Sequence, residues 1–166
     1  MGGRSAHRAP YLTVSMKTII IGLGNPILGD DGIGWRVAQQ VREQLPPGFP
    51  HPIEFLSLGG ISLMEYLVGY ERAILIDAIA SDREPGSIIL SDLSEMPDHS
   101  AFHTTSTHDT SLQKAINLGK AMGTVLPEQV IVVGITANHV YEFSEDLSLP
   151  VAGAVSRAAQ IVIDLL

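Results

Sequence analysis

Two carboxylates and one histidine stand at positions where they could bind a metal ion together. Asp31 follows a Gly-rich turn, Asp77 lies inside an apolar run, and His108 ends a long polar segment. Two carboxylates and one imidazole suit Ni, Zn, Mn or Fe, and they leave coordination positions open for water or a substrate. Because the chain contains no cysteine, any metal must be held by oxygen and imidazole nitrogen.

Each of these residues also has a purely structural interpretation. Asp30 and Asp31 both precede a helical pattern, where an acid commonly caps the helix and opposes its dipole, and we interpret Asp30 as that cap. For Asp31 the sequence leaves both roles open, helix cap and metal ligand. Burying Asp77 would be costly without a partner or a cation, which favours a functional role. Outside the N-terminal leader, four further histidines have loop-like contexts and no paired acid at a useful spacing, so we interpret them as surface residues: His51, His99, His103 and His139.

The elements that must position these residues follow from hydrophobic patterns. A β-branched strand over 18–21 leads through the Gly-rich turn into a helix with Ile33, Val37 and Val41 on one face. Further strands are expected at 52–58, 72–80, 87–91 and 130–136, and further helices at 61–67, from Asp109 to about Gly123, and from the N-cap Ser148 to Leu165.

This alternation predicts a three-layer α/β sandwich with a mainly parallel five-stranded sheet, one antiparallel strand, and helices on both faces. The strand at 87–91 follows the one at 72–80 so closely that we expect the two to pair antiparallel. In such sheets ligands bind beyond the carboxyl ends of the parallel strands. Asp31 and Asp77 should therefore meet at that edge, with His108 joining them from its loop.

Length and composition limit the domain organisation and the kinds of partner that this chain can have. With 166 residues, of which 45% are hydrophobic and 17% charged, we expect residues 16–166 to form one α/β domain and residues 1–15 to be a disordered leader or cloning remnant. A net charge of −8 without any cluster of Lys or Arg argues against nucleic acid or a membrane as partner. No apolar run approaches the roughly 20 residues that span a bilayer. A soluble, cytoplasmic protein is expected.

The glycines at 22, 24 and 29 do not form a dinucleotide-binding site. Their spacing is G-x-G-x-x-x-x-G, whereas the dinucleotide fingerprint is G-x-G-x-x-G. Asp30 and Asp31 at the helix start would also repel a pyrophosphate. We therefore expect no nucleotide cofactor.

A series of motifs in a fixed order resembles the hydrogenase maturation endopeptidases, the proteases that trim the large subunit of NiFe hydrogenases. The resemblance extends over residues 17–166. It rests on these blocks: Gly22-x-Gly-Asn-x-x-x-x-Asp30-Asp31-Gly-x-Gly34, Gly59-Gly60, Ile76-Asp77-Ala78, Ser106-x-His108, Gly134-Ile135 and Leu147-Ser148.

The resemblance implies a protease domain in which Asp31, Asp77 and His108 bind nickel. It also implies the partner, an immature large subunit already loaded with nickel, whose C-terminal extension is removed by one cut. The nickel cofactor would then be supplied with the substrate. Asp31 or Asp77 could also act as general base, and the sequence leaves open whether nickel is catalytic or only a recognition element.

Other hydrolases and a non-cleaving chaperone are the alternatives to this function. The chain has no Gly-x-Ser-x-Gly elbow and no His-Glu-x-x-His helix, so conventional serine or zinc proteolysis has no support. Gly22-Leu-Gly-Asn-Pro26 also opens peptidyl-tRNA hydrolases, but the Thr-Arg-His-Asn stretch expected next is replaced by Ile27-Leu-Gly-Asp-Asp31. A non-cleaving chaperone that checks for nickel would use the same three ligands and stays open as an alternative.

Overall fold

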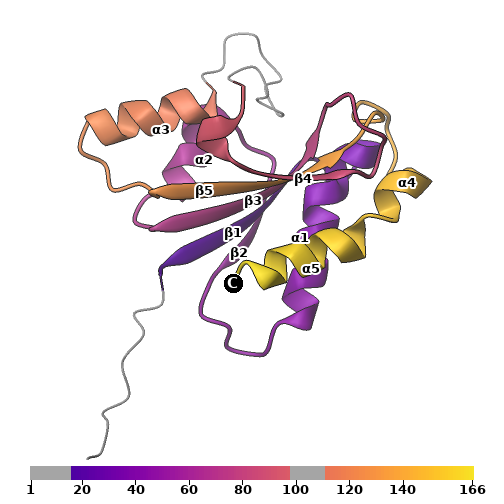
Figure 1. Cartoon of the computed structure of the whole chain (residues 1–166), viewed down its shortest axis with the longest axis horizontal. Coiled ribbons are helices and arrows are strands. Elements are labelled where there is room, and N and C mark those ends of the chain that lie inside the picture. Colours follow the sequence, from indigo (N-terminus) through magenta and orange to yellow (C-terminus); the bar gives the residue numbers. More distant parts are fainter. Residues whose placement is uncertain (1–15, 98–110) are drawn as a thin grey trace, which may run out of the picture.

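The chain builds one five-stranded sheet in the order β2-β1-β3-β5-β4. The computed structural model describes residues 16–97 and 111–166 (Figure 1). The strands are β1 (Thr18–Leu23), β2 (Ile53–Leu56), β3 (Arg72–Ile79), β4 (Ile88–Asp92) and β5 (Gln129–Thr136). All neighbours pair parallel except β4 and β5, which pair antiparallel. The expected mixed sheet is confirmed.

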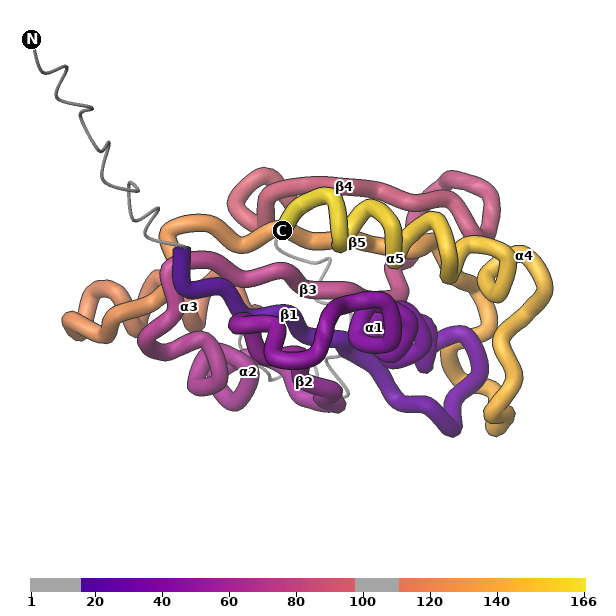
Figure 2. Tube along the Cα trace, turned by 90° about the horizontal axis from the view of Figure 1, so that it is seen from below, coloured from indigo at the N-terminus to yellow at the C-terminus, as the bar shows by residue number. Residues whose placement is uncertain are grey.

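Helices cover both faces of this sheet, which confirms the three layers. The helical segments are the 3-10 turn η1 (Gly29–Gly32), α1 (Ile33–Gln44), α2 (Gly60–Tyr66), the 3-10 turn η2 (Leu93–Glu95), α3 (Leu112–Ala121), α4 (Leu149–Ala152) and α5 (Val155–Asp164). Helices α1 and α5 lie on one face, and α2 and α3 lie on the other (Figure 1). Figure 2 shows α1 over β1 and α5 over β5. None of the helices in the described ranges is long and apolar enough to cross a bilayer.

The central strands are apolar throughout because each faces a helical layer on both sides. Along β1, Ile20 packs into the core under α1 and α5, whereas Ile19 and Ile21 pack into the core under α2 and α3. Strand β3 alternates in the same way, with Ile74 on the first side and Leu75 on the second.

The antiparallel strand does not have the partner that the sequence predicts. Strand β4 pairs with β5, with Ile89 opposite Gly134, and does not pair with its sequence neighbour β3. The reason is that β1 and β5 already occupy both sides of β3. The turn after β3 carries the chain past β5, where the Gly86 N–H donates to Thr136 O at 2.8 Å.

Two helix predictions also need correction. The helix expected to open at Asp109, which lies outside the described residues, begins at Leu112, because the Ser111 hydroxyl caps it by accepting the Lys114 N–H at 3.3 Å. The C-terminal helix is interrupted at Gly153 and Ala154, which separates α4 from α5.

Close packing of α1 against the sheet depends on two glycines. A Cβ on Gly34, in the first turn of α1, would collide with Leu23 O at the end of β1 and with Ile76 O in the carboxyl half of β3. Gly24 has a φ of 127°, which L-residues with side chains rarely adopt, and a Cβ there would collide with Asp31 O. The start of α1 therefore lies directly on the carboxyl ends of two strands.

Replacing Gly34 by Ala should lower stability by about 1–3 kcal/mol, because α1 must move away from β1 and β3 to admit a methyl group. The measurement is the urea-unfolding midpoint. Gly153→Ala is the matched control, since Gly153 has helical angles and its nearest neighbour would be an ordinary contact at 3.4 Å. Equal midpoints for the two variants would contradict this account of the packing.

Candidate functional site

Asp31 lies in the 3-10 turn that links β1 to α1. Its side chain is 8% exposed, and its Oδ2 accepts the Asn25 N–H at 2.7 Å. This hydrogen bond closes the Gly-rich turn, because Asn25 follows β1 and Asp31 precedes α1 by two residues. The carboxylate of Asp31 is thus fixed beyond the carboxyl end of β1.

Asp77 lies near the carboxyl end of β3 and is 3% exposed. Because strand side chains alternate between faces, it shares the α2 and α3 side of the sheet with Leu75. It stands opposite Gly134 of β5, and the Ile79 side chain fills the space over that glycine. A carboxylate is therefore held in mostly apolar surroundings.

The structure brings Asp31 and Asp77 to the same edge of the sheet, as the sequence predicted. Strands β1 and β3 are parallel neighbours whose pairing ends with Gly22 opposite Ile76, so Asp77 lies beside the point where β1 ends, while β3 continues to pair with β5 as far as Ile79. The turn that carries Asp31 also contacts β3. In the described ranges, no group of three His, Asp or Glu residues could hold a metal ion. His108, the third predicted ligand, lies outside the described residues.

Helix α3 starts at this same edge. It leads into β5, which runs parallel to β3, so the helix must cross back over the sheet from the carboxyl ends to the amino ends of the strands. Its far end is at the amino ends, where the Gly69 N–H donates to Val125 O at 2.9 Å. Ser111, three positions after His108 in the sequence, therefore begins α3 on the Asp77 side of the sheet.

Asp30 does not cap the helix that follows it, contrary to the sequence interpretation. The residue at the N-cap of α1 is Gly32, with no side-chain cap. Asp30 is fully buried and instead accepts two hydrogen bonds from Ser148, from the backbone N–H at 2.7 Å and from the hydroxyl at 2.8 Å. Ser148 is at the N-cap of α4, as expected, but its hydroxyl is used for this contact. Asp30 thus ties the turn carrying Asp31 to the C-terminal helices.

His139 has a paired acid, contrary to the sequence interpretation. Its Nδ1 lies 2.8 Å from Glu142 Oε1, three residues along an exposed loop. The hydrogen bond and the charge of Glu142, with a smaller contribution from Asp30, raise the pKa of His139 above 6.5. The carbonyl of His139 accepts the Asp30 N–H at 3.0 Å, which attaches this loop to the 3-10 turn that carries Asp31. The i, i+3 spacing of His and Glu was the available signal.

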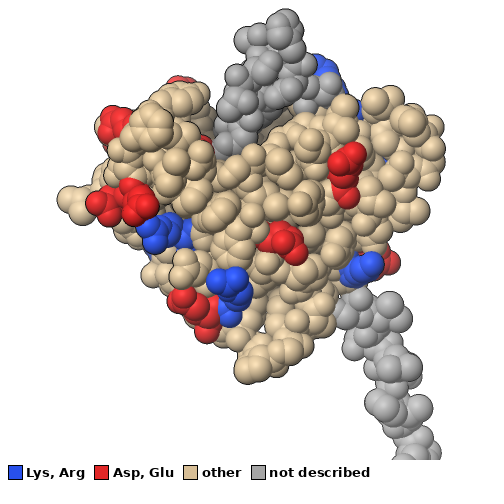
Figure 3. All heavy atoms as spheres, turned by 180° about the vertical axis from the view of Figure 1, so that it is seen from behind, with Lys and Arg blue, Asp and Glu red and all other residues tan. Residues whose placement is uncertain are grey.

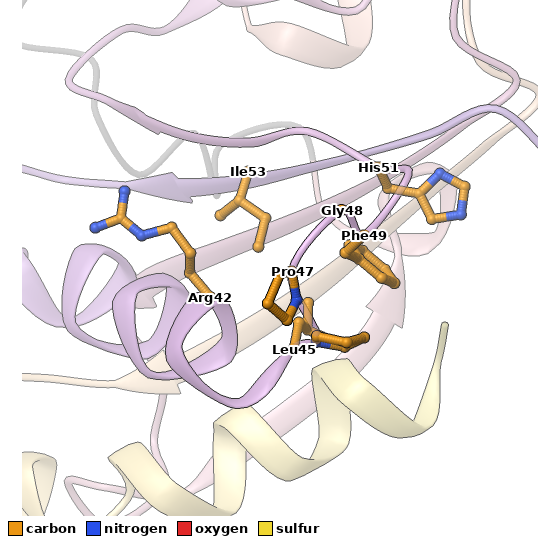
Figure 4. A pocket seen from close by; sticks show the side chains of 8 residues that line it. Arg42, Leu45, Pro47, Gly48, Phe49, His51 and Ile53 are labelled. Atoms are coloured by element: carbon orange, nitrogen blue, oxygen red, sulfur yellow. The ribbon is translucent and has the colours of Figure 1, made fainter.

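A separate hollow of about 420 Å³ lies at the opposite edge of the sheet (Figure 4). It is formed where α1 turns into β2, near the amino end of that strand. The lining side chains are Arg42, Leu45, Pro46, Pro47, Phe49, His51 and Ile53 together with Gly48. Arg42 stacks over Phe55 at 4.7 Å from the ring centroid, and His51 packs edge-on against Phe49. Neither Asp31 nor Asp77 contributes to this hollow.

Charged side chains are scattered over the face seen from behind. Figure 3 shows Lys and Arg there as separate groups with Asp and Glu between them.

The fold is that of an α/β protein whose candidate site residues Asp31 and Asp77 lie near the carboxyl ends of β1 and β3. Residues 56–165 match the family model described as hydrogenase maturation protease. The chain belongs to the hydrogenase maturation protease family.

Individual relatives agree with this assignment. The hydrogenase expression/formation protein HupD of Rhizobium leguminosarum bv. viciae is 23% identical over 150 residues, covering 90% of this chain and 74% of that protein. Among solved structures, the hydrogenase maturating endopeptidase HybD from E. coli has a TM-score of 0.72 at 22% identity, covering 91% of this chain and 92% of HybD. The hydrogenase maturation protease HycI from Thermococcus kodakarensis has a TM-score of 0.68 at 20% identity, covering 91% and 92% of the two chains.

Replacing Asp30 by Asn should lower the free energy of unfolding by about 3 kcal/mol, because two hydrogen bonds to a buried carboxylate are weakened or lost. Ser148→Ala removes only the hydroxyl donor and should cost about 1 kcal/mol. Chemical denaturation measures both values, and Asp146→Asn on the exposed loop is the control. If Asp30→Asn behaves like this control, Asp30 is not an anchor.

The His139 pair should be visible in an NMR titration. The imidazole is expected to titrate above 6.5 in the native protein and to return toward 6.5 in Glu142→Gln. Because the folded-state pKa is the higher one, the stabilising contribution of this pair is complete below pH 6.5 and disappears as the pH rises through the raised pKa. An unchanged His139 titration in Glu142→Gln would contradict the assigned cause.

Proposed function

We propose that this chain is a nickel-dependent endopeptidase that removes the C-terminal extension of an immature NiFe hydrogenase large subunit after nickel loading. The observation that carries the proposal is the pair of buried carboxylates, Asp31 and Asp77, at one edge of the sheet in a member of the hydrogenase maturation protease family. Asp31 comes from the turn between β1 and α1, and Asp77 from β3, the parallel neighbour of β1, which supports a shared role for them.

In this proposal Asp31, Asp77 and His108 bind the nickel that the precursor brings. The donor set fits, because carboxylate oxygen and imidazole nitrogen are ligands that nickel accepts. Asp31 is oriented by the Asn25 N–H, and the backbone of Asp77 is held in β3, which supports a role for both as preformed ligands. His108 precedes Ser111, which starts α3 on the Asp77 side.

The reaction is hydrolysis of one peptide bond. Nickel held at this edge would polarise the scissile carbonyl or a water molecule. Asp31 or Asp77 takes a proton from the attacking water, the water oxygen bonds to the carbonyl carbon, and the C–N bond breaks with the proton passing to the new amine. The apolar surroundings of Asp77 strengthen charge interactions there, because water is partly excluded.

The decisive experiment compares nickel-loaded and nickel-free precursor. The purified chain is mixed with the large-subunit precursors encoded in its own genome, and the released C-terminal peptide is identified by mass spectrometry. We expect cleavage of the loaded form alone. Binding without cleavage would establish the chaperone alternative, and cleavage of both forms would remove the nickel requirement.

Asp77→Asn should reduce the cleavage rate by about 100-fold or more, because an amide is a poor metal ligand and cannot accept the proton. The substitution keeps the side-chain size, so circular dichroism and the unfolding midpoint should show a folded protein. Glu128→Gln makes the same chemical change on an exposed side chain near the amino ends of the strands and should cleave at the normal rate. Normal cleavage by folded Asp77→Asn would remove Asp77 from the site.

A further inference from the structure

Three of the most exposed large apolar side chains in the described ranges lie in one short stretch. Tyr141, Phe143 and Leu149 are exposed by 89%, 87% and 89%. They belong to the loop and helix start that follow β5, at the carboxyl edge of the sheet. Exposed aromatic and aliphatic side chains that follow one another along a short stretch commonly mark a surface that binds another protein.

This stretch is attached to the turn that carries Asp31. The Ser144 N–H donates to Ile27 O at 3.1 Å, and the Gly29 N–H donates to Ser144 O at 2.7 Å, so the two segments run side by side as a parallel bridge. Residues at matching positions of such a bridge share a face, which places Phe143 next to the half-exposed Ile27. Figure 1 shows the segment between β5 and α4 beside the start of α1.

The backbone of the stretch is also ordered before any partner arrives. His139 O accepts the Asp30 N–H at its beginning, and Ser148 is bonded to the Asp30 carboxylate at its end. Tyrosine and phenylalanine have few rotatable bonds, so a partner loses little conformational freedom of the surface on binding.

Acidic residues alternate with these apolar side chains along the sequence, and of them Glu142 is paired with His139. Between residues 138 and 149 the sequence contains Glu142, Glu145 and Asp146 and no Lys or Arg. Arg36 reaches the stretch from α1, but its guanidinium donates to the Glu145 carbonyl at 2.9 Å. The complementary surface is therefore apolar with flanking positive charge.

We propose that Ile27, Tyr141, Phe143 and Leu149, here called the aromatic patch, dock the large-subunit precursor through a segment of apolar side chains flanked by Lys or Arg. This inference rests on the proposed function and adds a binding surface to the metal site. Because the patch and Asp31 share one hydrogen-bonded turn, docking on the patch sets the distance from the bound precursor to Asp31.

The test measures binding and cleavage of the nickel-loaded precursor by Tyr141→Ala/Phe143→Ala. We expect the dissociation constant and KM to rise at least about tenfold with kcat nearly unchanged, because truncating central aromatic anchors removes binding energy. Met122→Ala/Val125→Ala removes two other exposed side chains, 77% and 69% exposed, beyond the far end of α3, and should leave KM unchanged. Glu145→Gln/Asp146→Asn should weaken binding less and reduce its dependence on salt.

The outcomes separate this inference from the proposed function. Normal cleavage with an unchanged KM in the aromatic variant overturns the patch and leaves the endopeptidase intact. Weaker binding in that variant, with a wild-type chain that binds but never cuts, supports the patch and overturns the endopeptidase. Failure of the wild-type chain to bind any precursor overturns both. If sedimentation shows a wild-type dimer that the aromatic variant abolishes, the patch binds a second copy of the chain, and the precursor assignment is wrong.

Discussion

The structure depends on how closely the first turn of α1 approaches the sheet. The space between Gly34 of α1 and the carbonyls of Leu23 and Ile76 is too small for a methyl group. Gly24 has a φ of 127° and lies so close to Asp31 O that a Cβ on it would collide with this carbonyl. This approach forces the connection after β1 to be short and tightly hydrogen-bonded. A carboxylate in that connection has few conformations available, which is the property a metal ligand needs before the metal arrives.

The second carboxylate is positioned by a different means. Asp77 is part of β3, which pairs with β1 up to Ile76 and with β5 at Asp77 itself, so its backbone cannot shift without disturbing the sheet. A hydrogen-bonded turn therefore holds Asp31, and a paired strand holds the backbone of Asp77, through two separate sets of contacts. Local movement of one does not carry the other with it.

Much of this arrangement could be predicted from sequence, because it follows from local patterns. The β-branched run before Gly22 and the apolar run around Asp77 each determine a strand, and parallel pairing then brings Asp31 and Asp77 to one edge. The errors came from contacts between distant segments. The partner of β4 depends on which edge of the sheet is free, and the partner of Asp30 lies 118 residues away. The cap at Ser111 was missed because Asp109 is an equally good cap by residue type.

The bond between Asp30 and Ser148 also has a consequence for the order in which the protein can be completed. A ribosome produces the acidic turn early, whereas Ser148, which anchors it through Asp30, is made 118 residues later. A nascent chain therefore contains Asp31 long before the turn that carries it can be anchored. Chains that stop before Ser148 should lack this anchor, and the turn that carries Asp31 should be less ordered in them.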